Sequence, residues 1–288
     1  MVIAKVIGGL GNQMFQYAAG RALALANGCQ LKLDTSGFNS YGLHNGYELA
    51  RFDIKAEIAS VEDVARFVGP CPRIAKLVRQ ITGLGKKSYY LERSFSFDAG
   101  FLGNAPPVYL DGYWQSCKYF ELCASQIREE FTFSGPLVGR NFELAEQMAQ
   151  VNSVSIHIRR GDYVANSATS KVLGFVGVEY YREAMRRICN EVNAPWFFVF
   201  SDDLAWAKSN LGLVENVTFV DHNRGAFSCD DMRMMSLCRH HIIANSSFSW
   251  WAAWLNSDPG KIVIAPRRWF SRVSMDARDL LPGGWIKL

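Results

Sequence analysis

SVSIHIRRGDY, residues 153–163, is the stretch that decides the fold. Aliphatic residues alternate with polar ones through it, with the period of two that is typical of a strand with one buried face. The aliphatic set is Val154, Ile156 and Ile158, and the polar set is Ser155, His157 and Arg159. Ligands of open α/β sheets bind beyond the carboxyl ends of the strands, which is where Arg159 and Arg160 follow this strand. Because a planar guanidinium can hold two phosphate oxygens at once, the arginines predict a phosphate site, the alternative being a surface ion pair between Arg160 and Asp162.

A second anion site is predicted at the N-terminus. Residues 2–7 (VIAKVI) have the pattern of a strand, and residues 8–13 (GGLGNQ) form a glycine-rich turn. The next residues predict a helix that ends at Asn27-Gly28. A strand, a glycine turn and a helix N-terminus together offer backbone N–H groups and the positive end of the helix dipole to an anion.

The same turn leaves a second interpretation open, the dinucleotide site of an oxidoreductase. Gly9 and Gly11 would then bind the pyrophosphate, and Asp34, at the end of the next strand, would bind the ribose. Met14 counts against this interpretation, because it stands where the dinucleotide fingerprint has its third glycine.

Five stretches of the chain, taken in order, resemble the α-1,2-fucosyltransferases. They are GGLGNQMFQYA (8–18), DGYWQS (111–116), HIRRGDY (157–163), FSDD (200–203) and ANSSFSWW (244–251). The resemblance implies an α/β fold of the GT-B type, with two Rossmann-like domains facing across a cleft. It also implies inverting transfer of L-fucose from GDP-β-L-fucose to the 2-hydroxyl of a terminal β-galactoside, as in O-antigen synthesis. The alternatives are the oxidoreductase and a non-catalytic glycan-binding protein of the same fold.

The pattern along the chain predicts two domains. From residue 137 onward, apolar strands near 154–158, 196–200, 217–220, 242–244 and 262–264 alternate with helices. Continuous apolar strands separated by helices indicate a parallel sheet that is covered on both faces. Ser134-Gly135-Pro136 is the predicted link. We therefore expect an N-terminal domain at 1–135, with the glycine loop and the acceptor side, and a C-terminal domain at 136–288 that binds GDP-fucose.

The resemblance and the strand ends together select the residues expected at the donor. The full donor set is Gly9, Gly11, Asn12, His157, Arg159, Asp203, Ser246 and Ser247, with His157 assisting guanine or ribose recognition. Asp203 follows a strand, and its carboxylate matches the paired N–H donors of guanine; the alternative is that Asp202 or Asp203 caps the next helix. Ser246 or Ser247 likewise has the alternative role of a helix cap.

Three residues are predicted to take part in the chemistry itself. Arg159 would stabilise the charge that develops on the departing diphosphate, and Asn12 would lie close to the sugar. Asp162 is the candidate base for the acceptor hydroxyl, because inversion requires one.

The acceptor is assigned to Tyr113, Trp114 and Gln115, since aromatic faces and amide side chains commonly hold sugars. The alternative is that the two aromatic residues are simply buried in the domain core.

Composition narrows the class of protein further. The chain has 288 residues, a net charge of +4 and seven cysteines without a C-x-x-C pair, which fits a cytoplasmic protein with reduced thiols and no nucleic-acid partner. No Asp-x-Asp pair occurs, so we expect no metal and no cofactor, with arginine and backbone amides neutralising the diphosphate. The basic segment 73–87 predicts either peripheral contact with the inner membrane face or an ordinary helix packed on its own domain.

Overall fold

The computed structural model describes residues 1–288 except 41–44, 69–87, 162–173, 213–214 and 273–274. Asp162 and the basic segment 73–87 therefore lie outside the described residues. The chain divides into an N-terminal unit, Met1–Ser134 with Arg278–Leu280, and a C-terminal unit, Gly135–Ala277 with Leu281–Leu288. The first division lies one residue before the predicted one, and the short segment Arg278–Leu280 belongs to the N-terminal unit, although we expected it in the C-terminal domain.

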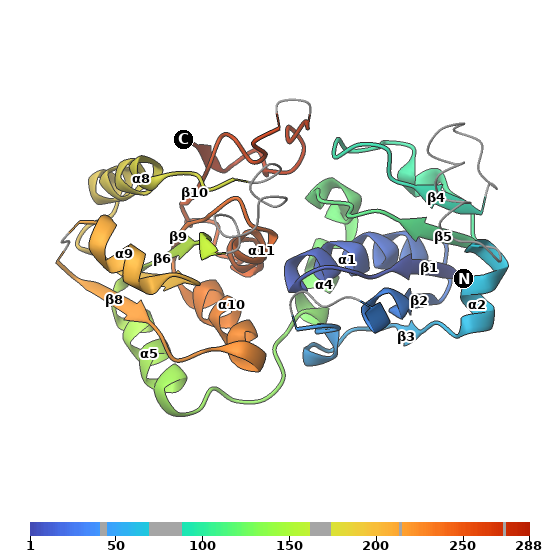
Figure 1. The fold of residues 1–288 in the computed structure, drawn as a ribbon, viewed down its shortest axis with the longest axis horizontal. Helices are drawn as coiled ribbons and strands as arrows, with labels where there is room; N and C mark the ends of the chain where they lie inside the picture. The colour runs from blue at the N-terminus through green and yellow to red at the C-terminus, as the bar shows by residue number, and fades with distance from the viewer. Residues whose placement is uncertain (41–44, 69–87, 162–173, 213–214, 273–274) are drawn as a thin grey trace. The chain divides into compact units, whose positions relative to one another are not determined.

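The N-terminal unit is built on a parallel sheet of the strand order β3-β2-β1-β5-β4 (Figure 1). Its strands are β1 (Val2–Lys5), β2 (Leu31–Asp34), β3 (Glu57–Ile58), β4 (Tyr89–Leu91) and β5 (Val108–Asp111). Its helices are α1 (Leu10–Ala26), α2 (Val61–Val68) and α4 (Ala124–Glu130). Short 3₁₀ turns cover Ser36–Ser40, Leu49–Arg51, Phe101–Gly103, Cys117–Tyr119 and Glu121–Cys123.

Helix α1 crosses between β1 and β2 and packs closely on the sheet. Gly20 makes the close approach possible, because a Cβ there would lie 2.9 Å from Cβ of Ala4. The helix ends at Ala26, next to the predicted stop, where Gly28 has a φ of +57°. Ile3 faces the other side of the sheet, where it packs in a cluster with Phe67 and Val68 of α2.

The C-terminal unit has the parallel strand order β11-β10-β9-β6-β7-β8. Its strands are β6 (Asn152–Ile158), β7 (Pro195–Ser201), β8 (Val217–Val220), β9 (His240–Ile242), β10 (Val263–Ala265) and β11 (Ile286–Lys287). Its helices are α5 (Gly139–Gln150), α8 (Val178–Glu191), α9 (Leu204–Asn210), α10 (Ser228–Leu237) and α11 (Ser247–Leu255), with a 3₁₀ turn at Gly225–Phe227. The predicted alternation of strands and helices is present.

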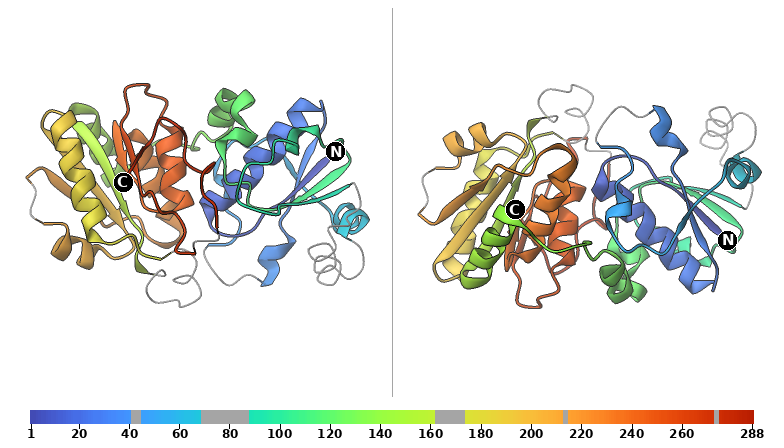
Figure 2. Two further views of the ribbon diagram at one scale, coloured as in Figure 1. Left: turned by 90° about the horizontal axis from the view of Figure 1, so that it is seen from above. Right: turned by 90° about the horizontal axis from the view of Figure 1, so that it is seen from below.

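Helices lie on both faces of the C-terminal sheet (Figure 2). The residues of strand β6 show why both faces must be covered. Its aliphatic residues pack with α8 and α9 in one core cluster. Its polar residues are also buried, and they find partners on the opposite face. Ser153 Oγ accepts from the backbone N–H of Arg239, and Ser155 Oγ contacts Nδ1 of His241 at 2.9 Å. The period of two therefore separates an aliphatic face from a hydrogen-bonded one, and His157 is the last buried residue on the hydrogen-bonded face.

Candidate active site

The carboxyl edge of the C-terminal sheet brings two arginines to two aspartates. Strands β6 and β7 are neighbours in register, with Ile158 opposite Ser201, so the residues that follow each strand meet. Arg159 Nε lies 3.3 Å from an oxygen of Asp202, and the guanidinium of Arg160 donates to Asp203. The backbone N–H of Arg160 also donates to Asp202 at 2.9 Å. Arg160 thus pairs with Asp203, while its alternative partner from the sequence, Asp162, lies outside the described residues.

Asp203 takes the helix-capping role that was the alternative to guanine binding. It is the N-cap of α9, and its Oδ1 accepts from the backbone N–H of Trp206 at 3.1 Å. Its other oxygen accepts from Arg160, whose guanidinium also lies 5.2 Å from the ring of Trp206. Both carboxylate oxygens therefore already hold protein donors, and a contact with guanine would use a remaining lone pair. Guanine binding by Asp203 stays a prediction.

His157 is buried with a free ring nitrogen at the same edge. The side chain is 6% exposed and packs against Phe248, with 5.7 Å between ring centroids. Its Nδ1 has no hydrogen-bond partner among the described residues. Burial, and then the charge of Arg159, lower the pKa of His157 to about 3, so the imidazole is neutral at physiological pH. A neutral ring with one unpartnered nitrogen suits a nucleobase or ribose hydroxyl better than a phosphate.

Helix α11 begins without the protein cap that α9 has. Ser246 is its N-cap residue, yet within the described structure its hydroxyl makes no capping hydrogen bond, and the first turn carries no acid. Ser246 and Ser247 are half-buried. Asn245 holds the preceding loop by donating to the carbonyls of Gly174 and Trp269, each at 3.0 Å. An uncapped, acid-free helix start that follows a strand favours an anion.

The glycine loop of the N-terminal unit has the same character. Gly8 has a left-handed backbone, with a φ of +90°, and a Cβ on it would lie 2.9 Å from Nδ2 of Asn12. Gly9 has a φ of −71°, which any residue adopts. Helix α1 then starts at Leu10 with no acid in its first turn and, in the described part of the chain, no side-chain cap. The N–H of Asn12 already donates to the carbonyl of Gly9, which leaves the side chain of Asn12 for the predicted contact with the donor.

Two buried amides on α1 hold the surrounding loops, and the sequence argument missed both. Gln13 donates to the carbonyls of Gly8 and Gly46 and accepts from the N–H of Glu48. Gln16 accepts from the N–H of Ile7 and donates to the carbonyl of Gly112. The signal that could have found them is their spacing, because two amides three residues apart on an otherwise apolar helix lie on one face.

The predicted acceptor residues divide into two kinds. Trp114 is 1% exposed and packs among Tyr90, Phe101 and Tyr119, so the structure places its ring in the core and not at an acceptor. Tyr113 is 38% exposed and stacks on Phe95. Gln115 is buried and donates through Nε2 to Oδ1 of Asn12 at 2.8 Å. The hydrogen bond joins two residues that the sequence assigned to acceptor and donor sugar separately.

Asp34 does not have the surroundings of a ribose ligand. It is 3% exposed, and its two oxygens accept from the hydroxyl of Tyr109 at 2.5 Å and from the N–H of Ser36 at 2.9 Å. Its role in the structure is to hold β2, β5 and the following turn together. The geometry therefore disfavours the dinucleotide interpretation.

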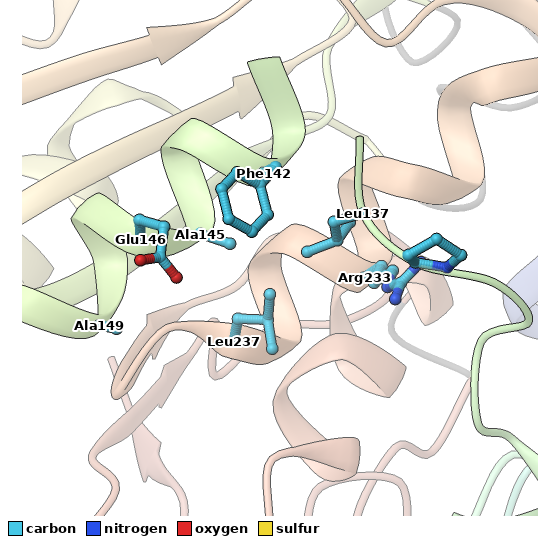
Figure 3. A pocket seen from close by; sticks show the side chains of 8 residues that line it. Leu137, Phe142, Ala145, Glu146, Ala149, Arg233 and Leu237 are labelled. Atoms are coloured by element: carbon cyan, nitrogen blue, oxygen red, sulfur yellow. The ribbon is translucent and has the colours of Figure 1, made fainter. Parts of the chain in front are cut away.

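Other features of the described residues add little to the site. Among them, no three His, Cys, Asp or Glu side chains come together as a metal ion would require, and no helix is long and apolar enough to cross a membrane. A surface hollow of about 410 Å³ lies on the C-terminal unit, between α5 and α10 (Figure 3). Its lining includes Phe142 and Leu237 but none of the predicted site residues.

Sequence comparisons relate this chain to named glycosyltransferases. The family model described as glycosyl transferase family 11 matches residues 48–288. An alpha-1,2-colitosyltransferase of Escherichia coli is 35% identical over 293 residues, covering 100% of this chain and 99% of the relative. The O-antigen biosynthesis glycosyltransferase WbnK of E. coli is 32% identical and covers 98% of both. The galactoside alpha-(1,2)-fucosyltransferase 1 of Lagothrix lagotricha is 30% identical over 86% of this chain and 63% of the relative.

Structure comparisons bear on the fold alone. The NodZ alpha-1,6-fucosyltransferase soaked with GDP-fucose has a TM-score of 0.50 and 16% identity, covering 88% of this chain and 91% of that one. Arabidopsis thaliana FUT1 in complex with GDP has a TM-score of 0.52 and 12% identity, covering 91% of this chain and 69% of that one. Together with the two parallel sheets, they show an α/β fold of the GT-B type, as expected from the sequence.

Proposed function

The chain belongs to glycosyl transferase family 11, and from that premise we propose that it transfers L-fucose from GDP-β-L-fucose to the 2-hydroxyl of a terminal β-galactoside. A β-linked donor and an α-linked product require inversion at the anomeric carbon. The observation that carries the proposal is the 30% identity, over 86% of the chain, to a galactoside alpha-(1,2)-fucosyltransferase. The full-length similarity to WbnK supports a role in O-antigen synthesis.

The charges at the carboxyl edge of the C-terminal unit support this chemistry. The diphosphate gains negative charge as the sugar departs, and catalysis requires donors that are already aimed at that charge. Arg159 and Arg160 are oriented by Asp202 and Asp203, so little reorganisation is needed when the diphosphate arrives. The uncapped start of α11 adds backbone N–H donors at the same edge. Asp162 remains our proposed base for the acceptor hydroxyl.

We propose further that the diphosphate is neutralised without a metal ion or another cofactor. The two guanidinium groups and the start of α11 supply N–H donors for the phosphate oxygens, although Asp202 and Asp203 balance the charge of the two arginines. Turnover of GDP-fucose should therefore persist in excess EDTA. A near-complete loss that Mn²⁺ or Mg²⁺ restores would contradict this part of the proposal.

A second donor is favoured by one specific relative. The E. coli protein that is 35% identical is named for transfer of colitose, which is L-fucose without its 3-hydroxyl. Apart from Asn12, which is expected near the sugar, the donor contacts assigned above are made to the nucleotide and the diphosphate, and both donors share these parts.

One assay tests both donors and the non-catalytic alternative. The purified protein is incubated with GDP-fucose or GDP-colitose and a panel of β-galactosides, and GDP release is followed together with the mass of the glycan product. We expect transfer from GDP-fucose to a terminal galactose. Transfer from GDP-colitose alone would replace the donor, and glycan binding without GDP release from either donor would identify a non-catalytic protein.

The bonding state of the cysteines supports a cytoplasmic location. The six cysteines in the described part of the chain form no disulfide, which fits a reducing compartment. A cytoplasmic enzyme would also have direct access to its nucleotide-sugar donor. Contact of residues 73–87 with the inner membrane face stays part of the proposal, and cell fractionation of a variant with neutral residues in that segment tests it.

A further inference from the structure

Glu92 binds the segment that the sequence assigned to the acceptor, although it belongs to none of the five motifs. It follows β4 directly, where Leu91 lies opposite Asp111 of β5. Its carboxylate accepts two backbone N–H groups, from Tyr113 at 2.6 Å and from Trp114 at 2.9 Å. Its own backbone N–H donates to the carbonyl of Asp111 at 3.0 Å. Side chain and main chain of one residue therefore hold the chain as it leaves β5.

The segment needs such a hold, because its backbone is unusual. Trp114 has a φ of +55°, a left-handed conformation that is rare for a bulky residue and persists where the surroundings impose it. Gly112 makes room for the carboxylate, since a Cβ there would lie 2.4 Å from Cβ of Glu92 and 2.8 Å from the Trp114 ring. The buried indole and the two hydrogen bonds to Glu92 together stabilise the turn.

The turn fixes the orientation of the two residues on either side of Trp114. Tyr113 stays 38% exposed, with an aromatic face that a sugar could cover. Gln115 turns inward and donates to Asn12, at the start of α1. If the turn relaxed, the exposed ring and the amide pair would both lose their positions.

We propose that Glu92 is a positioning residue for the acceptor, because its carboxylate holds the 112–115 turn in the conformation that presents Tyr113 and fixes Gln115 on Asn12. The inference rests on the proposed function, since it takes the acceptor to be a β-galactoside. It deepens that function by assigning acceptor affinity, as distinct from donor affinity, to a residue outside the family's motifs.

The charge state of Glu92 adds a pH dependence to this role. The pKa of Glu92 is raised to about 7, chiefly by burial and to a smaller extent by the neighbouring Asp111, while the two N–H donors act to lower it. Tyr113 and Tyr119 also face the carboxylate, and the nearby cation Lys5 contacts Asp111 instead, at 3.4 Å. Protonation turns one accepting oxygen into a hydroxyl, which accepts more weakly. The turn should therefore loosen as the pH falls below about 7.

Steady-state kinetics of Glu92→Gln against wild type test the proposal. The amide keeps the shape but offers one accepting oxygen in place of two, so we expect the acceptor KM to rise about tenfold while the donor KM stays within about twofold. Glu57→Gln is the matched control, because Glu57 lies on β3 of the same sheet with an exposed side chain. Equal rises in both KM values, or no rise in either, would overturn the positioning role.

Two measurements keep the proposal testable if Glu92→Gln fails to fold or the enzyme uses another acceptor. In wild type, the KM for the working acceptor should rise as the pH is lowered from about 8 to about 6; a KM that is constant over this range overturns the inference. Hydrogen exchange of the Tyr113 and Trp114 amides, measured without any substrate and corrected for the intrinsic pH dependence of amide exchange, should show falling protection over the same range. If no β-galactoside is fucosylated, the proposed function fails, whereas unchanged protection of these amides overturns the role of Glu92 alone.

Discussion

The two ligand-facing edges of this protein are built with different chemistry. At the C-terminal edge, arginines meet aspartates in two charged pairs, Arg159 with Asp202 and Arg160 with Asp203. At the N-terminal edge, neutral amides make most of the loop contacts, through Gln13, Gln16 and the Gln115–Asn12 pair, beside the ion pair of Lys5 with Asp111. A diphosphate brings charge and needs oriented cations, while sugar hydroxyls are recognised by hydrogen bonds from neutral groups as well. The difference fits the proposal that the C-terminal unit receives the diphosphate.

The two arginines of the charged edge should contribute little to stability. The side chains of the four charged residues are 24–29% exposed, so water and salt partly screen the two pairs. Ion pairs near the surface contribute about 0–1 kcal/mol to stability. Substitution of Arg159 or Arg160 should therefore alter catalysis while the free energy of unfolding changes little.

Of the substitutions considered, Arg159→Lys, at the charged edge, should reduce activity most. Lysine keeps the charge but loses the planar fork, so kcat/KM for GDP-fucose should fall by about tenfold or more, in line with the ~1.5–3 kcal/mol of a charge-assisted hydrogen bond. The measurement is donor kinetics at saturating acceptor. Arg182→Lys, on the exposed surface of α8, is the matched control and should retain wild-type kinetics. Wild-type behaviour of Arg159→Lys would remove Arg159 from the diphosphate site.

Asn12→Ala tests the neutral edge, with Asp34→Ala as its counterpart. Asn12 is half-buried and its amide pairs with Gln115, so its loss should lower kcat/KM by up to about tenfold, the value of one neutral hydrogen bond, with little change in Tm.

Asp34→Ala should show the opposite pattern, because it leaves the buried hydroxyl of Tyr109 unpaired. We expect a loss of about 1–3 kcal/mol of unfolding free energy and near-normal kinetics of the folded enzyme. Thermal unfolding and initial rates, measured on both variants, decide the matter. A fully active Asn12→Ala paired with an inactive, well-folded Asp34→Ala would favour the dinucleotide interpretation.

Asp203→Ala, also at the charged edge, should have the smallest effect of these substitutions. Loss of the α9 cap should cost about 0.5–2 kcal/mol of stability. If Asp203 also contacts guanine, GDP binding should weaken while binding of pyrophosphate is unchanged. Calorimetric titration with both ligands measures this. Equal weakening of both would show that Asp203 acts by holding Arg160.

The local sequence was sufficient to predict an element wherever one hydrophobic period or one residue type dominates a segment. The alternation in residues 153–158 predicted β6, the apolar strands predicted a parallel sheet covered on both faces, and Asn27-Gly28 predicted the end of α1. The FSDD and HIRRGDY stretches also followed adjacent strands, as their patterns indicated. The roles of these residues toward a ligand stay predictions.

What the sequence by itself determined is thus the order of the elements and the residues that end each strand, because both follow from periodicity and turn chemistry within a few residues of chain. Only the tertiary structure decided which partner each of these residues has. Arg160 pairs with Asp203 across 43 positions, Gln115 reaches Asn12 across 103, and Glu92 holds a turn about 20 residues away. It also buried Trp114 and gave Gly8 a left-handed backbone. Such pairings depend on strand order and register, which no short segment encodes, since neighbouring strands in a parallel sheet are joined through distant crossovers.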